Sequence, residues 1–529
     1  ATIGANFEGD GEYKQAGISI GTIQGDTSLF LNVSKSEEKE IGAGDRTISE
    51  TPVAYVPQRF GSAFGLYGIF NTSEGFQSLD PEKEGAGVRT ADDFEPFGTK
   101  HRYNFAPTNY LKTPSERLNV FAKVNHEFSD TLSAFVNFTY NQRKSVTQIA
   151  AVPLVAGFSG PQWEIPYSKD NIYNPFGEDL TAFGFRTLPI GPRTNIQDYD
   201  TYFITGGFEG EFEIADTSLF WDVSMSRGDS SRNEHGENFV NLQNLRNAVG
   251  PSFVQDGVAQ CGTADDVISG CVPLNLFNGE TGFTDEMANY IGYELNNQVK
   301  TGTTNFTANI SGEIFELPAG FVGFAAGYEK RTNTYVDNPD SVVAAGLSSS
   351  NFSEPTNGSQ TAEESYFEFA IPLLSELPGV QSLELSIAGR FSDFENSGFV
   401  GTNPVTSKFD NESFKFGFTW RVFDDLMFRG NYSDTFRAPS VNNLFAGGGD
   451  GFPSTQFPLQ SAATQARCIA DGVPDGGSIQ PTGQLRSLNG GNPGLQPEEG
   501  NTTTFGVVYN PSWLDGFDMT VDMYKIELS

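Results

Sequence analysis

Residues 411–440 contain two stretches in which apolar and polar residues alternate with a period of two. The apolar set of the first stretch consists of Phe414, Phe416, Phe418, Trp420 and Val422. The alternation restarts at Leu426 and continues to Tyr432, after the short link Phe423-Asp424-Asp425. Strict alternation predicts strands with one apolar and one polar face, and the short link predicts an antiparallel hairpin. The aromatic face would turn inward in a soluble sandwich, but toward lipid in a membrane barrel.

Similar strands recur along the whole chain, in pairs joined by short turns. The predicted strands are Thr2–Glu8, Glu12–Thr22, Ser28–Ser36, Leu118–Phe128, Leu132–Tyr140, Thr201–Phe212, Leu219–Arg227, Asn305–Ile314, Phe321–Arg331, Tyr366–Ile371, Ser382–Phe394, the two strands of the hairpin above, Thr503–Tyr509 and Phe517–Glu527. Apart from the first link, short turns and long loops alternate strictly. Antiparallel pairing therefore sends every tight turn to one end of the sheet and every long loop to the other.

This asymmetry, with strands of about ten residues, is typical of outer-membrane barrels. A sandwich does not need it, and a solenoid would show a fixed repeat length. We therefore predict an all-β fold, an antiparallel transmembrane β-barrel of about 15 strands with short periplasmic turns and long extracellular loops. Barrels of one bacterial chain normally have an even number of strands, so an odd count predicts a fragment. No signal peptide is visible at residue 1, which also predicts a piece of a longer protein.

The composition excludes some classes of function. The 529 residues contain 32 Lys and Arg against 67 Asp and Glu, for a formal charge of −35. Such a field argues against nucleic acid as a partner. The acidity is explained by solubility or a salty habitat, or else by attraction of cationic or metal-bearing ligands. No apolar run approaches the length of a transmembrane helix.

Cysteine and histidine give no metal-binding pattern. Cys261 and Cys271 lie in one Gly/Asp/Ser-rich loop, which predicts a local disulfide in an oxidising compartment. Cys468 has no obvious partner. The three histidines, His101, His126 and His235, are far apart and lack paired-ligand spacing.

No enzyme motif rises above chance. Gly17-Ile18-Ser19-Ile20-Gly21 matches the G-x-S-x-G pattern of a nucleophile elbow, but it lies inside an alternating strand instead of a strand-to-helix turn. Asp424-Asp425 is interpreted as a solvated turn and not as a metal site. We predict no catalytic residue, no metal and no cofactor.

Two groups of side chains allow a structural and a functional interpretation. The basic residues on the polar strand faces would form a salt-bridged lumen wall, or would contact an internal domain or cargo; they include Arg331, Lys415, Arg421 and Arg429. The loop aromatics would pack among the loops, or would stack on a sugar or an aromatic ligand; they include Trp163, Tyr167, Tyr173 and Phe176.

Several short motifs resemble TonB-dependent receptors. Residues 435–445, TFRAPSVNNLF, resemble the FRAPS…ELF segment of that family, and residues 490–498, GGNPGLQPE, resemble its GNPxLxPE segment. Val521-Asp522-Met523-Tyr524-Lys525-Ile526 resembles the strand that follows. Upstream motifs are similar to a large proteobacterial branch; they are Tyr103–Pro107, Asn109–Leu111, Asn174–Gly177, Gly191–Arg193 and Cys271–Asn275. Their order and spacing extend the resemblance over essentially the whole chain.

The resemblance implies a barrel of 22 strands with a plugged lumen. Residues 1–529 would be part of this barrel, without the N-terminal plug and the last strands. The implied function is outer-membrane uptake of a scarce nutrient with energy passed by TonB. A passive porin and a β-rich adhesin are the alternatives. The implied partners are outer-membrane lipid and lipopolysaccharide, TonB through the plug region, and a small organic ligand such as an oligosaccharide, siderophore or cobalamin. The barrel would be a monomer, and carbohydrate or another organic nutrient is favoured over iron.

The family motifs are expected to have architectural roles. Pro439 cannot donate to a strand ladder, so we expect the segment Phe436, Arg437, Ala438, Pro439 and Ser440 to leave the barrel wall. Asn492-Pro493 and Gln496-Pro497 would stiffen the return into the strand that begins near Thr502, and Glu498 completes this architectural motif. Contact with a ligand is the alternative role.

Overall fold

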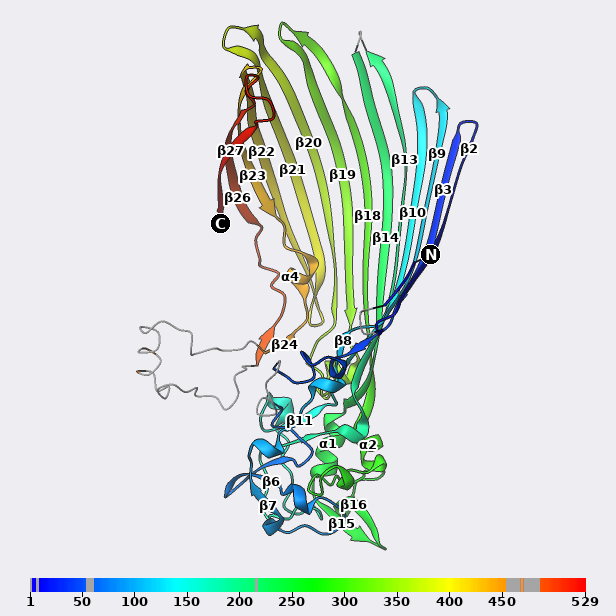
Figure 1. Ribbon diagram of the computed structural model, residues 1–529, viewed down its shortest axis with the longest axis vertical. Helices are drawn as coiled ribbons and strands as arrows, with labels where there is room; N and C mark the ends of the chain where they lie inside the picture. Colours follow the sequence, from blue (N-terminus) through cyan, green and yellow to red (C-terminus); the bar gives the residue numbers. More distant parts are fainter. Residues whose placement is uncertain are drawn as a thin grey trace.

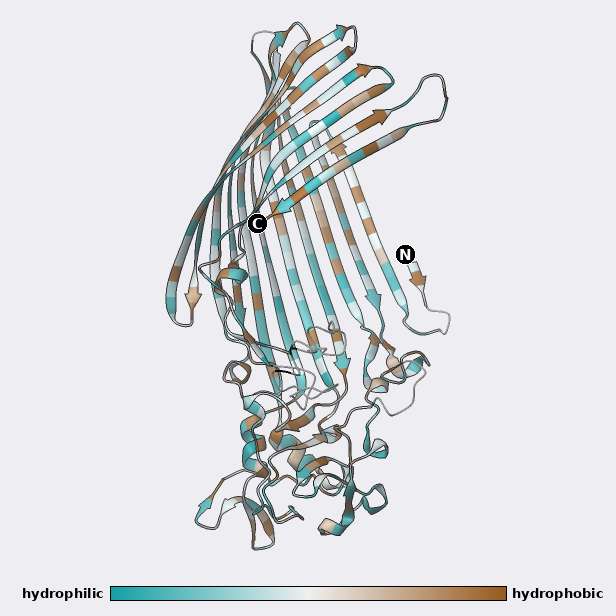
Figure 2. Ribbon diagram, turned by 90° about the vertical axis from the view of Figure 1, so that its left-hand side faces the viewer, coloured by the Kyte–Doolittle hydropathy of each residue, from teal (hydrophilic) through white to brown (hydrophobic). Residues whose placement is uncertain are grey.

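One antiparallel sheet of 15 strands dominates the computed structural model, which describes residues 2–5, 9–53, 61–214, 217–452, 467, 470 and 486–529. The strands of this sheet are β1 (Thr2–Gly4), β2 (Tyr13–Gln24), β3 (Thr27–Glu38), β9 (Ser115–Ser129), β10 (Leu132–Ile149), β13 (Arg193–Ile214), β14 (Thr217–Val240), β18 (Gly292–Leu317), β19 (Gly320–Asn338), β20 (Thr356–Leu377), β21 (Val380–Val400), β22 (Asn403–Phe423), β23 (Leu426–Arg437), β26 (Glu498–Tyr509) and β27 (Met519–Leu528). Each pairs with the next in the chain, and the sheet is curled with open edges at β1 and β27 (Figures 1 and 2). The predicted fold class is confirmed.

The two ends of the sheet differ as the sequence predicted. Two-residue links join β2 to β3, β9 to β10, β18 to β19, β20 to β21 and β22 to β23 at one end. The long connections gather at the other end, at the bottom of Figure 1. One expected long loop is absent, because β21 and β22 are joined there by residues 401–402 alone. The strict alternation of turns and loops was therefore wrong at this hairpin.

Strand register places the apolar residues of neighbouring strands in continuous rows on one face, which we call the outer face. One such row contains Phe212, Leu219, Gly312, Phe324, Phe369, Ile387, Phe416 and Tyr432. The opposite, inner face has polar rows, one of which contains Glu209, Asp222, Asn309, Gly327, Tyr366, Arg390 and Ser413. Figure 2 shows the resulting alternation of hydropathy along each strand. This two-faced wall is the pattern that a lipid-facing barrel requires.

The strands are much longer than the predicted ten residues, reaching 26 residues in β18. The reason is visible at the β21–β22 pair. Its outer face is apolar up to Phe391, but continues with Asp393 paired to Asp410 and with Glu395 joined to Lys408. Apolar alternation therefore ends while backbone pairing continues, and the sequence pattern marks only the lipid-facing part of each strand.

The long connections fold into a cluster of their own at the loop end. This loop cluster consists of the described parts of residues 39–114, 150–192 and 241–291, and its elements are β4 (Ile41–Gly42), β5 (Ile69–Thr72), β6 (Gly75–Leu79), β7 (Phe94–Pro96), β8 (Tyr110–Lys112), β11 (Pro153–Ala156), β12 (Phe183–Arg186), α1 (Leu242–Val249), β15 (Ser252–Gln255), β16 (Val258–Thr263), β17 (Asp266–Val267) and α2 (Asp285–Ile291). Buried residues from these segments form one apolar core, in which the centres of the Phe70 and Phe277 rings lie 4.7 Å apart.

The remaining elements are α3 (Ser341–Ala344), α4 (Val441–Phe445), β24 (Gly449–Gly451) and β25 (Ser487–Asn489). No helix within the described ranges is long and apolar enough to cross a membrane. Three sequence-based expectations concern positions outside the described residues: the end of the predicted strand Thr2–Glu8, the turn at Ala215-Asp216, and Cys468.

Candidate functional site

A groove runs along the inner face between the wall and helix α4, which lies on the concave side of the sheet (Figures 1 and 2). Its volume is about 460 Å³. We call it the inner groove; the side chains that line it are Thr201, Phe203, Ser230, Thr301, Thr303, Asn333, Tyr335, Gln360, Ser440, Val441 and Asn442, with Gly228 between them. Tyr202, Asp229 and Thr334 also border it, but strand alternation points their side chains to the outer face; Gly302 borders it with backbone atoms alone.

Strand register explains why these residues meet. Phe203 pairs with Gly228, Gly228 with Thr303, Thr303 with Asn333 and Asn333 with Gln360, so that one row crosses five strands. The next row toward the loops contains Thr201, Ser230, Thr301 and Tyr335. Strand residues as far apart in sequence as Thr201 and Gln360 thus form a single surface.

Helix α4 is held against this surface by packing and by a capped N-terminus. Ser440 Oγ accepts a hydrogen bond from the Asn443 N–H (3.2 Å), and Asn443 Oδ1 accepts one from the Ser440 N–H (3.0 Å). The buried Phe445 ring lies over Gly398, where a Cβ atom would come within 2.4 Å of it. The absence of a side chain at this position lets the helix approach the strand.

Gln360 ties the segment before α4 to the wall. Its buried amide Nε2 donates to the Pro439 carbonyl (2.8 Å) and to Asn396 Oδ1 (2.7 Å). Since β23 ends at Arg437, Pro439 is already off the sheet when this contact is made.

A network of ion pairs crosses the inner face on the side of the groove nearer the tight turns. The Arg390 guanidinium donates to both carboxylate oxygens of Glu364, at 3.0 and 2.7 Å, and to Glu329 at 3.2 Å. Arg331 donates to the other Glu329 oxygen at 2.9 Å. Glu364 is only 5% exposed, and Ser392 Oγ also donates to it. Such bidentate and shared ion pairs hold the charged groups in fixed orientations. They also offset the free-energy cost of removing these groups from water.

Comparison with protein families gives one match over most of the chain. Residues 155–529 match the family model described as TonB dependent receptor-like, beta-barrel. The chain belongs to the TonB-dependent receptor β-barrel family. Members of this family are receptors and transporters of the Gram-negative outer membrane. No curated protein sequence matches the chain significantly.

Solved structures of import and siderophore receptors are also similar. They include the ferric-catecholate import receptor Fiu from E. coli K12, with 11% identity, a TM-score of 0.43, and coverage of 98% of this chain and 56% of that one. The siderophore receptor PirA from Acinetobacter baumannii has 12% identity and a TM-score of 0.43, over 98% of this chain and 50% of that one. FauA, the alcaligin receptor of Bordetella pertussis, has 9% identity and a TM-score of 0.42, over 98% and 50%. The chain therefore spans about half the length of these structures.

The two motif segments of this TonB-dependent receptor chain meet in space. The Gly491 N–H donates to the Ala446 carbonyl (2.8 Å) at the end of α4, and the Asn492 N–H donates to the Asn443 carbonyl (2.9 Å). Arg437, where β23 ends, is the ladder partner of Glu498, where β26 begins, and their charged groups lie 3.5 Å apart. Pro493 and Pro497 lie between these contacts, in the short irregular stretch that enters β26.

The basic residues predicted for the lumen wall have partners on or near it. Arg331 belongs to the ion-pair network above, and Arg429 donates to both oxygens of Asp522, at 3.1 and 2.7 Å. Lys415 lies 3.9 Å from Glu368, and Arg421 donates to the Asp424 carbonyl (3.2 Å). These contacts favour the salt-bridged wall over free cationic ligand sites.

The loop aromatics are part of the core of the loop cluster. Tyr167 is fully buried, and its hydroxyl donates to Asn171 Oδ1 (3.1 Å) and to the Leu274 carbonyl. Burial raises the pKa of Tyr167 well above its ordinary value. Trp163 is 5% exposed, and Tyr173 and Phe176 pack against the same core. These contacts favour packing among the loops over stacking on a ligand.

Arg186 connects three segments of the loop cluster. Its Nε donates to the Phe64 carbonyl (3.2 Å), its Nη1 donates to the Ala151 carbonyl (2.9 Å), and its guanidinium lies 5.3 Å from the centre of the Tyr103 ring. Burial, with a smaller effect of nearby Arg193, lowers the pKa of Arg186 to about 10. It still carries a proton at neutral pH, so this buried cation acts as a structural donor.

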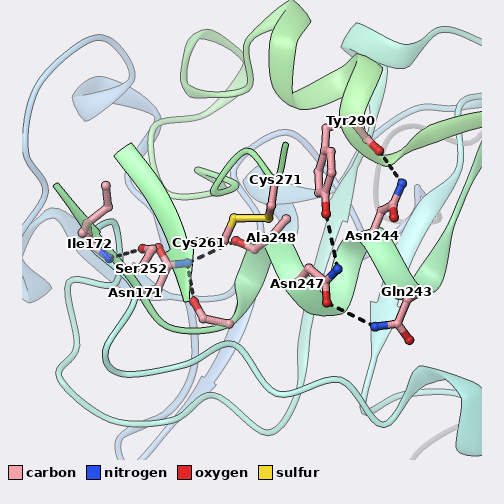
Figure 3. Close-up of a disulfide and its surroundings, with 11 residues drawn as sticks. Asn171, Ile172, Gln243, Asn244, Asn247, Ala248, Ser252, Cys261, Cys271 and Tyr290 are labelled. Carbon is pink, nitrogen blue, oxygen red and sulfur yellow. Dashed lines mark hydrogen bonds between the residues drawn. A yellow bond between two sulfur atoms is a disulfide. The ribbon is translucent and has the colours of Figure 1, made fainter. Parts of the chain in front are cut away.

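Cys261 and Cys271 are joined by a disulfide with an S–S distance of 2.03 Å (Figure 3). The bonded pair lies beside α1. Asn171 Nδ2 donates to the carbonyl of Ala248 in α1 (3.2 Å), and the Ile172 N–H donates to Oγ of Ser252, the first residue of β15 (2.9 Å). The disulfide thus closes a small hairpin against the end of α1.

Other candidate motifs are not brought together. Gly17–Gly21 lie within β2, and the three histidines occupy separate regions. His101 contacts Glu95 (2.9 Å), His126 contacts Thr27 (2.8 Å), and His235 contacts Asn296 (3.0 Å). Within the described ranges no group of three or more His, Cys, Asp or Glu side chains could hold a metal ion. Asp425 accepts hydrogen bonds from the N–H and hydroxyl of Ser512, as expected of a turn residue.

Sequence reasoning missed Phe203, Asn333 and Gln360. The last two lie in segments that were interpreted as loop, because the outer face of these strands is polar at that height. Only the pairing register brings them together, and a single sequence carries no direct signal of it.

Proposed function

We propose that the chain is part of an outer-membrane receptor that takes up a scarce organic nutrient with energy supplied through TonB. The observation that carries this proposal is the two-faced wall in a chain whose residues 155–529 match the receptor barrel model. An apolar outer face suits contact with lipid, and a polar, ion-paired inner face suits a wet or protein-filled lumen. A catalytic role is not part of the proposal.

We further propose that residues 1–529 belong to the barrel domain of a larger receptor. The edges at β1 and β27 do not pair with each other in the described sheet. Unpaired backbone groups are costly in lipid, so further strands would close the sheet, up to the 22 that the family resemblance implies. A plug domain inside the lumen would contact TonB. Outer-membrane lipid and lipopolysaccharide would surround a monomeric barrel.

Energy dependence separates this proposal from a passive porin. The full-length receptor would be produced in two isogenic Gram-negative strains, one with TonB and one without it. Accumulation of labelled maltohexaose, ferric enterobactin and cyanocobalamin would be measured in both. We expect at least one probe to accumulate only in the strain with TonB, and a plug-deleted receptor to abolish this difference.

Equal accumulation in the two strains would indicate a porin and overturn the proposal. Absence of accumulation of every probe, with the protein correctly assembled in the outer membrane, would favour an adhesin and also overturn it.

A further inference from the structure

We propose that the inner groove binds a neutral, polyhydroxylated ligand, namely a segment of an oligosaccharide. This inference rests on the proposed function, because it assigns a substrate class to the same receptor. Along the strands, the groove lies closer to the long loops than the apolar part of the outer face does. At the level of the groove the outer face is polar. There the Tyr202 hydroxyl donates a hydrogen bond to Asp229, and Arg227 Nε also donates to Asp229 (2.9 Å). A ligand that enters between the loops would therefore reach the groove before the membrane-embedded lumen.

Phe203 supplies a flat apolar platform in this groove. Gly228, its partner across the strands, has no side chain, and a Cβ atom there would lie only 2.7 Å from Phe203 Cδ2. The ring therefore lies over the backbone of β14, and Phe203 is 42% exposed toward the lumen. An exposed aromatic face with polar neighbours is suited to stack on the apolar face of a sugar ring.

Hydroxyl and amide groups surround the platform in fixed positions. The hydroxyls of Thr201 and Ser230 lie 2.8 Å apart in a hydrogen bond. Thr303 Oγ1 donates to Asn333 Oδ1 at 2.9 Å, which orients the Asn333 amide. Within the described part of the chain, Asn333 Nδ2 makes no hydrogen bond, so two N–H donors are available to ligand hydroxyls.

The charge around the groove favours a neutral ligand over an anionic one. None of the residues that line it is Lys or Arg. The nearest cations by register lie in the rows on either side of the groove. Arg331, toward the tight turns, is paired with Glu329 and Glu364. Arg143 and Arg232 lie in the row beyond Thr201 and Ser230 toward the loops, where Arg143 stacks on the Tyr199 ring (4.5 Å) and Asp337 belongs to the same row. The chain has a formal charge of −35, which would repel an anionic ligand over longer distances.

Titration calorimetry on the purified full-length receptor tests this assignment. The probes are neutral hexasaccharides of glucose, xylose and N-acetylglucosamine, with ferric enterobactin as an anionic probe. We expect at least one hexasaccharide to bind. F203L removes the aromatic face while keeping an apolar side chain, and should weaken this binding roughly tenfold. N333A should weaken it roughly threefold to tenfold through the lost donors.

T307A is the matched control. Thr307 lies on the same strand and the same face as Thr303, and is hydrogen-bonded to Ser224 (2.8 Å), but it is outside the groove. We expect its affinity to stay within about twofold of the wild type. Heat-modifiable migration on gels would verify that each variant is folded.

Two results would overturn the assignment: no hexasaccharide binds, or F203L and N333A both bind as the wild type does. TonB-dependent uptake of ferric enterobactin or cyanocobalamin without hexasaccharide binding would reject the ligand class and leave the proposed function intact. Hexasaccharide binding with TonB-independent uptake would reject the proposed function instead.

Discussion

Gly491 illustrates how single residues determine the approach of the motif segments to each other. A Cβ atom at this position would lie 2.5 Å from the Ala446 nitrogen and 2.6 Å from the Leu444 carbonyl carbon, both backbone atoms that cannot move independently. The adjacent Gly490 is different, because the nearest atom to its Cβ position is 3.6 Å away. The two neighbouring glycines therefore have separate roles, and only Gly491 is required by close packing.

We expect Gly491→Ala to displace the chain from α4 and to destabilise this junction by about 1–3 kcal/mol, the usual range for overpacking. Gly490→Ala, its control, should have an effect within about 0.5 kcal/mol. Urea-dependent loss of heat-modifiable migration of the full-length receptor measures both. Equal stability of the two variants would show that the contact at Gly491 is not as close as described.

The buried hydroxyl of Tyr167 predicts a pH effect at the same scale. Because the pKa of Tyr167 is raised above its ordinary value of 10.0, the folded cluster holds this proton more tightly than the unfolded chain does. The contribution of the protonated Tyr167 hydroxyl to the stability of the loop cluster is fully present below about pH 10. It is lost as the pH rises toward the pKa of Tyr167 in the folded cluster. Tyr67 and Tyr173 shift in the same direction, mainly through burial.

Hydrogen exchange of residues 242–249 and 274–277, corrected for intrinsic rates, should therefore show weaker protection above about pH 10. Tyr167→Phe should lower protection already at pH 8, by about 1–3 kcal/mol, since the Leu274 carbonyl loses its donor. Tyr173→Phe is the control, because the Tyr173 hydroxyl makes no hydrogen bond within the described chain. Identical protection in both variants would contradict this role of Tyr167.

Among the structural elements, the strands were predicted best where contact with lipid requires apolar and polar residues to alternate. The hairpin of β22 and β23 was located by its alternating aromatic residues, and in the structure Phe416 pairs with Tyr432 on its outer face. Beyond Phe391 the outer face meets water, so no apolar alternation is required there. The strand ends, the turn at 401–402 and the inner groove could not be predicted for this reason. The contact between Gly491 and α4 depends on tertiary packing, for which neither motif has a local signal.

The orientation of β22 predicts the effect of charge on its two faces. Phe416→Asp places a carboxylate on the outer face, and should destabilise the assembled barrel by roughly 2 kcal/mol or more. Thr419→Asp places the same group on the inner face of the same strand, beside its ladder partner Arg429, and should be tolerated. The yield of heat-modifiable receptor in isolated outer membranes compares the two. Equal assembly of both variants would mean that the outer face does not meet lipid.

The disulfide between Cys261 and Cys271 in the loop cluster can be tested chemically. Peptide mapping of the full-length receptor without reduction should recover Cys261 and Cys271 linked to each other. Closing a loop with a sequence separation of 10 should contribute about 2–3 kcal/mol to the stability of this region. Free thiols at both positions would reject the link.

At the scale of the whole molecule, the polarity of both faces of the sheet changes from the loop end toward the tight turns. The outer face changes from charged to apolar where the strands enter lipid, and the inner face passes from the neutral groove to the ion-pair network. The acidic net charge would favour neutral or cationic cargo over anionic cargo. This organisation requires that the aromatic face of the sheet be in contact with the membrane.

A nitroxide scan along β22 tests this requirement most directly. Single cysteines would replace residues 414–421 one at a time in the full-length receptor, with Cys468 changed to Ser, in lipid vesicles. Collision rates with apolar oxygen should then peak at Phe414, Phe416, Phe418 and Trp420, and fall at the four positions between them. Peaks at the intervening positions, or no period of two, would contradict the orientation of the sheet and with it the proposed receptor.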